Sequence, residues 1–156
     1  MAKPLLLLLA LCLFLTGCGH ESAAPSYAFD DLSIQIPEDY INLSDEDFAA
    51  DLAFVFGKDP IALNGLREEK ATFEAYGLDL DLESYGKFLM LSNKVSSELL
   101  QTDGIWNFTY TSGEFTYIVT LWETQEAFWT VQAYCPTESY AEAKKDMWSI
   151  LSSVTV

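Results

Sequence analysis

Apolar and polar residues alternate along three segments in the last third of the chain, residues 105–111, 114–123 and 126–135. This period of two predicts β-strands, because successive side chains of a strand point to opposite faces of a sheet. The short links between the segments, Thr-Ser-Gly and Thr-Gln, favour antiparallel neighbours. We expect one face to be wholly apolar and the other to mix threonine, glutamine and aromatic residues. The apolar face is expected to hold Phe115, Tyr117, Val119, Leu121, Ala127, Trp129, Val131, Ala133 and Cys135.

Three other segments favour helices. Residues 66–76 are mostly good helix formers and stop before Gly77, a residue type common just after a helix. Residues 82–95 place Leu82, Tyr85, Leu89 and Ser92 along one stripe. Thr137 is expected to cap a last helix that runs to residue 151. The apolar face of that helix is expected to carry Tyr140, Ala143, Met147 and either Ile150 or Leu151.

The region before these helices predicts short elements. Residues 32–36 alternate as a strand does and end at Pro37, and Ser44 with Asp47 resembles a capping box for a helical turn over 45–50. Residues 52–56 fit both a helix face and a strand. We favour a strand that turns at 57–60 into another strand over 61–64. Together these elements predict an α+β fold, an antiparallel sheet of five to six strands packed by helices.

The first residues follow the plan of an export signal. Lys3 is followed by an unbroken apolar run of eleven residues, 5–15, which is short for a membrane span and typical of a signal peptide. Leu15-Thr16-Gly17-Cys18 resembles the lipobox of bacterial lipoproteins. The resemblance implies cleavage before Cys18, lipid attachment to Cys18 and a location on the extracytoplasmic face of the cell membrane. The alternatives are an ordinary signal peptide with a chance cysteine, or a buried N-terminal helix.

This interpretation divides the chain into a signal peptide over 1–17, a lipidated flexible tether over 18–26 and one domain over 27–156. The tether segment GHESAAPS is small, polar and contains proline, as flexible linkers often are. The domain has a size that needs neither a disulfide nor a metal to fold. Its only further cysteine, Cys135, has no partner for an internal disulfide if Cys18 is lipidated.

The charge is strongly one-sided. The chain has 24 acidic and eight basic residues, and loss of the signal removes only Lys3, which leaves a net charge of −17. Such a surface repels nucleic acid and anionic lipid headgroups, so we expect no nucleic-acid partner. Apolar and aromatic residues are interleaved with the acidic ones, which indicates a folded acidic domain. A ligand is expected to be neutral or cationic.

Two segments resemble the PsbP-like fold, which is shared by an extrinsic photosystem protein and many bacterial lipoproteins. They are LSIQIPEDY and the closing run GEFTYIVTLWETQEAFWTVQAYCPTESYAEAKKDMWSILSSVTV. The chain is also similar to small lipoproteins of Gram-positive gut bacteria, which place a helical Glu-x-Tyr segment before their hairpins, here Glu83-Ser84-Tyr85. The resemblance covers most of residues 27–156. It implies a fold and no activity, because the fold carries no shared catalytic residues.

No residue pattern in the chain assigns a catalytic group, a metal ligand or a cofactor. The only histidine, His20, lies in the predicted tether, which removes histidine-dependent triads and zinc sites from the domain. Ser84 and Lys87 match the serine–lysine pattern of penicillin-binding enzymes but lack its partner motifs. Asp79-Leu-Asp81-Leu-Glu83 begins like a calcium loop and then fails at Ser84 and Met90. Cys135 is predicted to be a buried, unreactive thiol.

The aromatic residues remain as candidates for ligand contact. Most of them must form the core, but Trp106, Trp122 and Tyr134 are possible ligand-contacting side chains. The predicted function is a non-catalytic binding or accessory domain, anchored to a membrane, with an unknown protein or small-molecule partner. One alternative is a small carboxylate-dependent hydrolase of cell-wall glycans. Another is a structural or chaperone-like partner of an envelope or export system.

The lipobox interpretation predicts that Cys18→Ala abolishes lipid attachment. Cells fed a clickable fatty acid should label the wild-type protein and leave the variant unlabelled. Cys12→Ala is the matched control, because Cys12 leaves with the signal peptide and its loss should not reduce labelling of the mature chain. Label that persists on the Cys18 variant would contradict the assignment.

Overall fold

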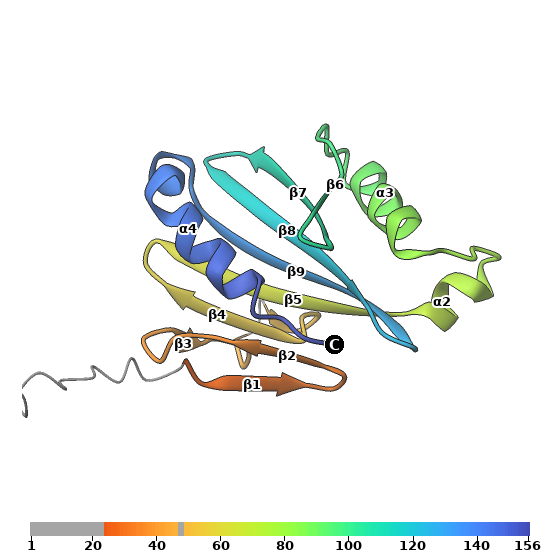
Figure 1. The fold of residues 1–156 in the computed structure, drawn as a ribbon, viewed down its shortest axis with the longest axis horizontal. Coiled ribbons are helices and arrows are strands. Elements are labelled where there is room, and N and C mark those ends of the chain that lie inside the picture. The colour runs from red at the N-terminus through yellow and green to blue at the C-terminus, as the bar shows by residue number, and fades with distance from the viewer. Residues whose placement is uncertain (1–23, 47–48) are drawn as a thin grey trace, which may run out of the picture.

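The computed structural model describes residues 24–46 and 49–156, so the predicted signal peptide and Cys18 lie outside the described residues. Two antiparallel sheets are present, a seven-stranded sheet in the order β3-β4-β5-β9-β8-β7-β6 and a separate β1–β2 hairpin (Figure 1). The strands are β1 (Ser26–Phe29), β2 (Leu32–Gln35), β3 (Ile41–Asn42), β4 (Phe54–Lys58), β5 (Ile61–Glu69), β6 (Leu100–Thr102), β7 (Ile105–Ser112), β8 (Phe115–Glu123) and β9 (Ala127–Pro136).

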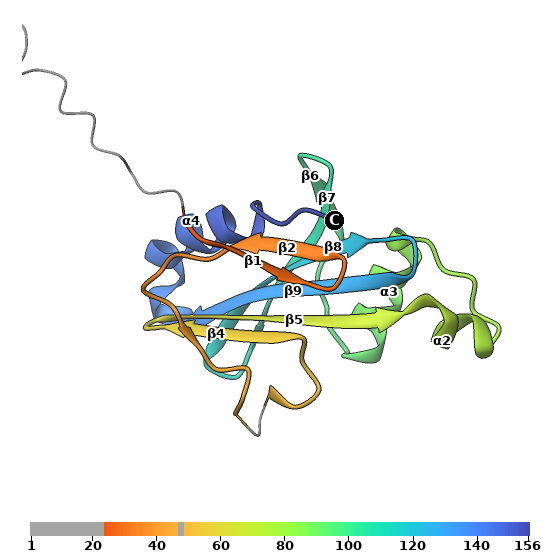
Figure 2. The ribbon, with the colours of Figure 1, turned by 90° about the horizontal axis from the view of Figure 1, so that it is seen from below.

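Helices and the hairpin cover the two faces of the large sheet. Helix α4 (Tyr140–Leu151) and the β1–β2 hairpin lie on one face, while α3 (Leu82–Ser92) lies on the other (Figures 1 and 2). The short helix α2 (Lys70–Ala75) follows β5 at one end of the sheet. The fold is therefore α+β with an antiparallel sheet, as predicted. The large sheet has more strands than expected because two very short edge strands, β3 and β6, complete it.

The core on the α4 face joins the last helix, the sheet and the hairpin. Met147 and Leu151 of α4, Trp129 of β9 and Ile34 of β2 are fully or almost fully buried there. The predicted apolar face of the last helix is confirmed, and both Ile150 and Leu151 belong to it. The helix begins two residues later than expected, because residues 137–139 form a 3₁₀ turn and Ser139 takes the N-cap position assigned to Thr137.

The prediction that β8 and β9 share one apolar face is wrong. In the observed register Ile118 pairs with Ala133, so Ile118 joins the α4 face together with Trp129 and Val131. Val119 and Leu121 point to the α3 face instead, beside Phe128. Each strand alternates as predicted, but the register places the more apolar side chains of β8 and those of β9 on different faces of the sheet. Both faces are consequently half apolar, and both are covered.

The helix predicted over 66–76 forms only over Lys70–Ala75. Strand β5 continues to Glu69, and its residues 62–69 pair with β9 down to the Glu69–Ala127 pair. Backbone pairing in the centre of the sheet therefore overrides the helix preference of the first four predicted residues. The predicted stop is confirmed, since Gly77 has a φ of +76°, which glycine adopts readily.

The predictions for the short strands are confirmed, and those for the end of α3 need small corrections. The strands over 32–36, 52–56 and 61–64 correspond to β2, β4 and the first half of β5. Helix α3 ends at Ser92, and Met90 rather than Ser92 lies on its buried side. The Ser44–Asp47 cap involves a residue outside the described ones. The Ser44 hydroxyl accepts a hydrogen bond from the backbone amide of Val55 at 2.9 Å.

Cys135 is fully buried on the α4 face and makes no disulfide within the described residues. Burial raises the pKa of its thiol, so the thiol stays protonated at neutral pH. The predicted buried cysteine is confirmed. Ser26, placed at the end of the predicted tether, begins strand β1.

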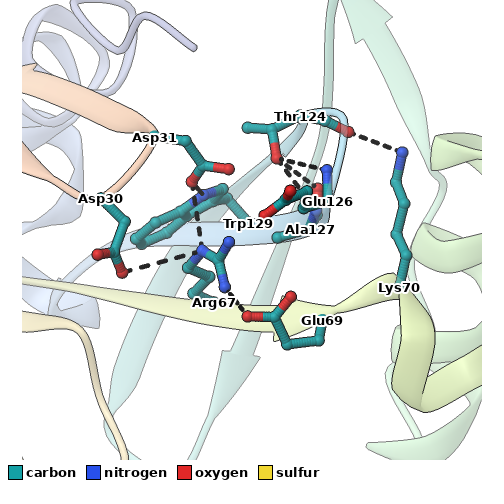
Figure 3. A network of polar contacts seen from close by, with 9 residues as sticks. All are labelled: Asp30, Asp31, Arg67, Glu69, Lys70, Thr124, Glu126, Ala127 and Trp129. Carbon is teal, nitrogen blue, oxygen red and sulfur yellow. Dashed lines mark hydrogen bonds and ion pairs between the residues drawn. The ribbon is translucent and has the colours of Figure 1, made fainter.

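One polar network fastens the hairpin to the large sheet (Figure 3). Oδ1 of Asp31, in the β1–β2 turn, accepts hydrogen bonds from Trp129 Nε1 at 2.8 Å and from Arg67 Nε at 3.3 Å. Asp30 lies 3.9 Å from the same guanidinium, which also pairs with Glu69. Burial alone would raise the pKa of Asp31, but hydrogen bonds with its neighbours and the Arg67 charge lower it to about 2.

We expect Asp31→Asn to lower the free energy of unfolding by about 1 kcal/mol at pH 7, after allowance for solvent screening of a side chain one-third exposed. The pKa of Asp31 is lower in the folded state than its ordinary 3.8, so its stabilisation is complete above that pH. It is lost as the pH falls towards about 2. Urea unfolding at several pH values should show the two curves converging at low pH. Asp30→Asn, on a more exposed carboxylate, is the control and should change little.

Candidate functional site

Tyr85 anchors α3 to the sheet. Its hydroxyl lies 2.6 Å from Glu68 Oε2, to which it donates, and 2.7 Å from the hydroxyl of Thr130. Its ring stacks on Phe128 with 4.5 Å between centroids and 10° between planes. Burial first and the hydrogen bond to Glu68 second raise the pKa of Tyr85 far above its ordinary range, so it is a neutral donor. The Glu-x-Tyr segment noted in the sequence thus has a structural role.

The residue after this anchor brings α3 unusually close to the sheet. A Cβ atom at Gly86 would lie 2.6 Å from Leu121 Cδ1 and 3.0 Å from Leu99 Cδ2, so the helix packs there only because the residue is glycine. The contact occupies the first turns of the helix. Beneath its later turns, around Leu89 and Asn93, side chains leave a hollow against the sheet.

We call this hollow the α3 cleft. It has a volume of about 190 Å³ and lies between α3, the loop before β4 and the α3 face of strands β5, β7, β8 and β9. None of its lining residues is charged. Its walls combine apolar side chains with a few polar groups, the usual composition of small-molecule sites. The apolar residues are Leu52, Leu66, Leu89, Val95, Phe108 and Val119, and the polar ones are Asn64, Asn93, Tyr110, Thr130 and Gln132.

Two carboxamides lie on the floor of the cleft. Asn64 of β5 and Gln132 of β9 are direct cross-strand partners, so their side chains lie next to each other on one face. Asn64 is only 8% exposed. Within residues 24–46 and 49–156 neither side chain makes a hydrogen bond to another residue. Every fully buried side-chain nitrogen or oxygen of these residues has a hydrogen-bond partner, so the unpaired Asn64 carboxamide must be reached by solvent. The Asn64 carboxamide therefore opens into the cleft.

A row of three tyrosines, Tyr110, Tyr117 and Tyr134, extends from the cleft across β7, β8 and β9. Their rings stack in sequence with centroids 4.7 Å and 5.0 Å apart. Because both faces of the central ring, Tyr117, are covered by its neighbours, that ring offers only its edge and its hydroxyl to a ligand. Burial raises the pKa of Tyr110 and Tyr134, which keeps these hydroxyls protonated.

The structure separates the three aromatic residues proposed from the sequence. Tyr134 belongs to the tyrosine row, and Trp106 packs, half-buried, against the core on the same face. Trp122 lies on the opposite face, where its Nε1 donates to Thr120 Oγ1 at 3.1 Å. A single site cannot contain all three. Their contact with a ligand stays a prediction, and Cys18 lies outside the described residues.

A second and larger hollow, of about 510 Å³, lies between α2, the start of α3 and the β8–β9 turn. It carries several carboxylates, but Lys70 already supplies a cation there. The Lys70 ammonium lies 2.7 Å from Glu123 Oε1, 2.7 Å from the Thr124 carbonyl and 5.1 Å from the centre of the Phe128 ring. The hydrogen bond from the backbone amide of Ser84 lowers the pKa of Asp81, the N-cap of α3.

Neither a metal centre nor a membrane span is found in the described part of the chain. Among residues 24–46 and 49–156, no three histidine, cysteine, aspartate or glutamate side chains gather as metal ligands would. In the same residues no helix is long and apolar enough to cross a bilayer.

Comparison with known proteins identifies the fold. No protein-family model matches the chain, and no curated protein sequence does. The solution structure of cyanobacterial PsbP (CyanoP) from Synechocystis sp. PCC 6803 superposes with a TM-score of 0.55 at 14% identity, covering 91% of this chain and 98% of that one. A crystal structure from Bacteroides thetaiotaomicron VPI-5482 gives a TM-score of 0.54 at 13% identity over 86% of this chain. The chain spans about half of that longer protein, 48% of its length.

These likenesses define the domain as PsbP-like in fold. The predicted α+β class and its PsbP-like arrangement are thus confirmed. At 13–14% identity the likeness concerns the fold alone, and it transfers no ligand or activity.

The anchoring role of Tyr85 predicts that Tyr85→Phe destabilises the domain by about 1–3 kcal/mol, because Glu68 and Thr130 lose a buried partner. Hydrogen exchange should accelerate most along α3. Tyr76→Phe is the control, since Tyr76 is 81% exposed and its hydroxyl loss should have no effect. Equal stability of the two variants would contradict an anchoring role.

Proposed function

We propose that this chain is a lipoprotein anchored through Cys18 on the extracytoplasmic face of a membrane, and that its domain binds a neutral ligand in the α3 cleft without turning it over. The anchoring part rests on the lipobox-like residues 15–18 and the signal-like run before them. The binding part rests on one observation above all: the Asn64 carboxamide is almost buried, has no hydrogen-bond partner among residues 24–46 and 49–156, and lines a cleft.

The lining of the cleft supports a neutral ligand over a cationic one. A net charge of −17 on the mature chain disfavours anions, but it does not distinguish neutral from cationic molecules. The cleft itself contains no carboxylate to pair with a cation. An ion placed there would lose hydration without gaining a counter-charge, which is costly.

The carboxyl groups support binding over hydrolysis. A glycan hydrolase needs a carboxyl with a raised pKa as its general acid, about 5–9.5 Å from a second carboxyl. The pKa of Asp31 and that of Asp81 are both lowered, the direction opposite to that of a general acid. Asp31 is also occupied in fastening the hairpin. We therefore keep the hydrolase as the alternative and not as the proposal.

The binding proposal is tested on the full chain in detergent, with small probes of known charge. Acetamide and ethanol should shift the side-chain amide NMR signals of Asn64 and Gln132, whereas acetate and methylammonium should not. Leu52→Trp, which fills the mouth of the cleft from a loop, should abolish these shifts. Ile41→Trp is the matched control, because Ile41 is 67% exposed and lies outside the cleft.

The same preparation tests the absence of turnover. We expect no product from purified peptidoglycan or from fluorogenic glycosides. Turnover that disappears when one Asp or Glu is changed to its amide would overturn the proposal in favour of the hydrolase. Shifts caused only by the charged probes would overturn the neutral-ligand assignment.

A further inference from the structure

We propose that the α3 cleft receives the acetamido group of an N-acetylated amino sugar. This inference rests on the proposed binding function and names the chemical class of its ligand. Three features carry it: the paired carboxamides, the size and lining of the cleft, and the tyrosine row beside it.

The paired carboxamides match an amide. Each carboxamide has an NH₂ donor and a carbonyl acceptor, and those of Asn64 and Gln132 lie side by side on the floor of the cleft. A trans secondary amide presents its carbonyl and its N–H in one plane and in opposite directions, so it bridges the two carboxamides when it lies between them. Its carbonyl accepts from one NH₂ group while its N–H donates to the other carbonyl. A ligand without such a pair would leave Asn64 buried and unsatisfied, which costs binding free energy.

The size of the cleft limits how much of the ligand can enter it together with that amide. A cavity of 150 Å³ in another protein accommodates benzene, so the α3 cleft at about 190 Å³ holds a group slightly larger than one small ring. An acetamido group with the edge of its sugar fits this volume, and a long acyl chain does not. Leu66, Leu89 and Val119 supply apolar contact for the acetyl methyl.

The tyrosine row favours a sugar over a peptide. Among the described residues the hydroxyls of Tyr110, Tyr117 and Tyr134 have no hydrogen-bond partner, and they stand beside the cleft on three adjacent strands. Sugar hydroxyls both donate and accept, so they can pair with such a row. One common mode of peptide binding adds a strand to an unpaired sheet edge. Strands β8 and β9 are paired on both sides, so the sheet beneath the row offers no such edge. Strand β6 pairs only with residues 105–107 of β7, so the far side of β7 beyond residue 107 is the place where a peptide could add.

The inference is tested by titrating the full chain with chitotriose, whose three sugars are N-acetylated, and with cellotriose, whose sugars lack the acetamido group. NMR or calorimetry should show chitotriose binding at least tenfold more tightly. Asn64→Leu should weaken chitotriose binding at least tenfold. Gln35→Leu, which removes an exposed carboxamide from the hairpin, should leave it unchanged. If Asn64→Leu does not fold, Gln132→Met, at a half-buried position, serves the same purpose.

Other results of these titrations would overturn the inference, the proposed function or both. Equal binding of the two trisaccharides would overturn the inference, because the acetamido group would not be recognised. Binding of N-acetylalanine methylamide in place of chitotriose would overturn it in favour of a peptide. If acetamide shifts the Asn64 signals but chitotriose does not bind, the inference fails and the proposed binding function stands. If no neutral probe binds, both fail.

Discussion

The ladder between β5 and β9 is the constraint on which the rest of the structure depends. Eight residue pairs, from Ala62–Tyr134 to Glu69–Ala127, fix these two central strands against each other. A shift of one residue would exchange the faces of every side chain in one of the strands. The observed register places Arg67 beside Trp129 on the α4 face and Asn64 beside Gln132 on the α3 face. The fastening of the hairpin and the floor of the cleft therefore follow from the same set of backbone hydrogen bonds.

The two faces of the sheet are covered in different ways. On the α4 face the last helix and the hairpin together seal a continuous core that includes Trp129, Met147 and Cys135. On the α3 face one eleven-residue helix covers a wider area of sheet. It is held closely at Tyr85 and Gly86, and the later turns leave polar side chains accessible. The proposed binding surface is the part of the sheet that the helix does not fill.

Much of the fold could be predicted from the sequence, because alternation and helical periodicity survive in the structure. The strands around Val119 and Val131 and the buried face of α4 are examples. Periodicity could not show which face of the sheet each set of alternating side chains occupies, since the strand register depends on contacts between distant residues. Nor could it show that Leu66 to Glu69, good helix formers, would extend β5. One feature of the sequence pointed weakly to the cleft: Asn64 and Gln132 are amides flanked by apolar residues or glycine. Only the fold brings them together.

The way the chain enters the domain has a mechanical consequence. Strand β1 starts at Ser26, which pairs with Gln35, and the amide of Ile36 bonds to the carbonyl of Pro25 at 3.1 Å. A force applied to the chain ahead of β1 thus pulls on the open end of a two-stranded hairpin and peels its bonds one after another. The hairpin is itself fastened through Asp31 at its turn and through Ser33, which pairs with Thr155 near the C-terminus. Tension on the N-terminal segment is therefore borne first by the hydrogen bonds of the hairpin, before it reaches the central ladder and the cleft.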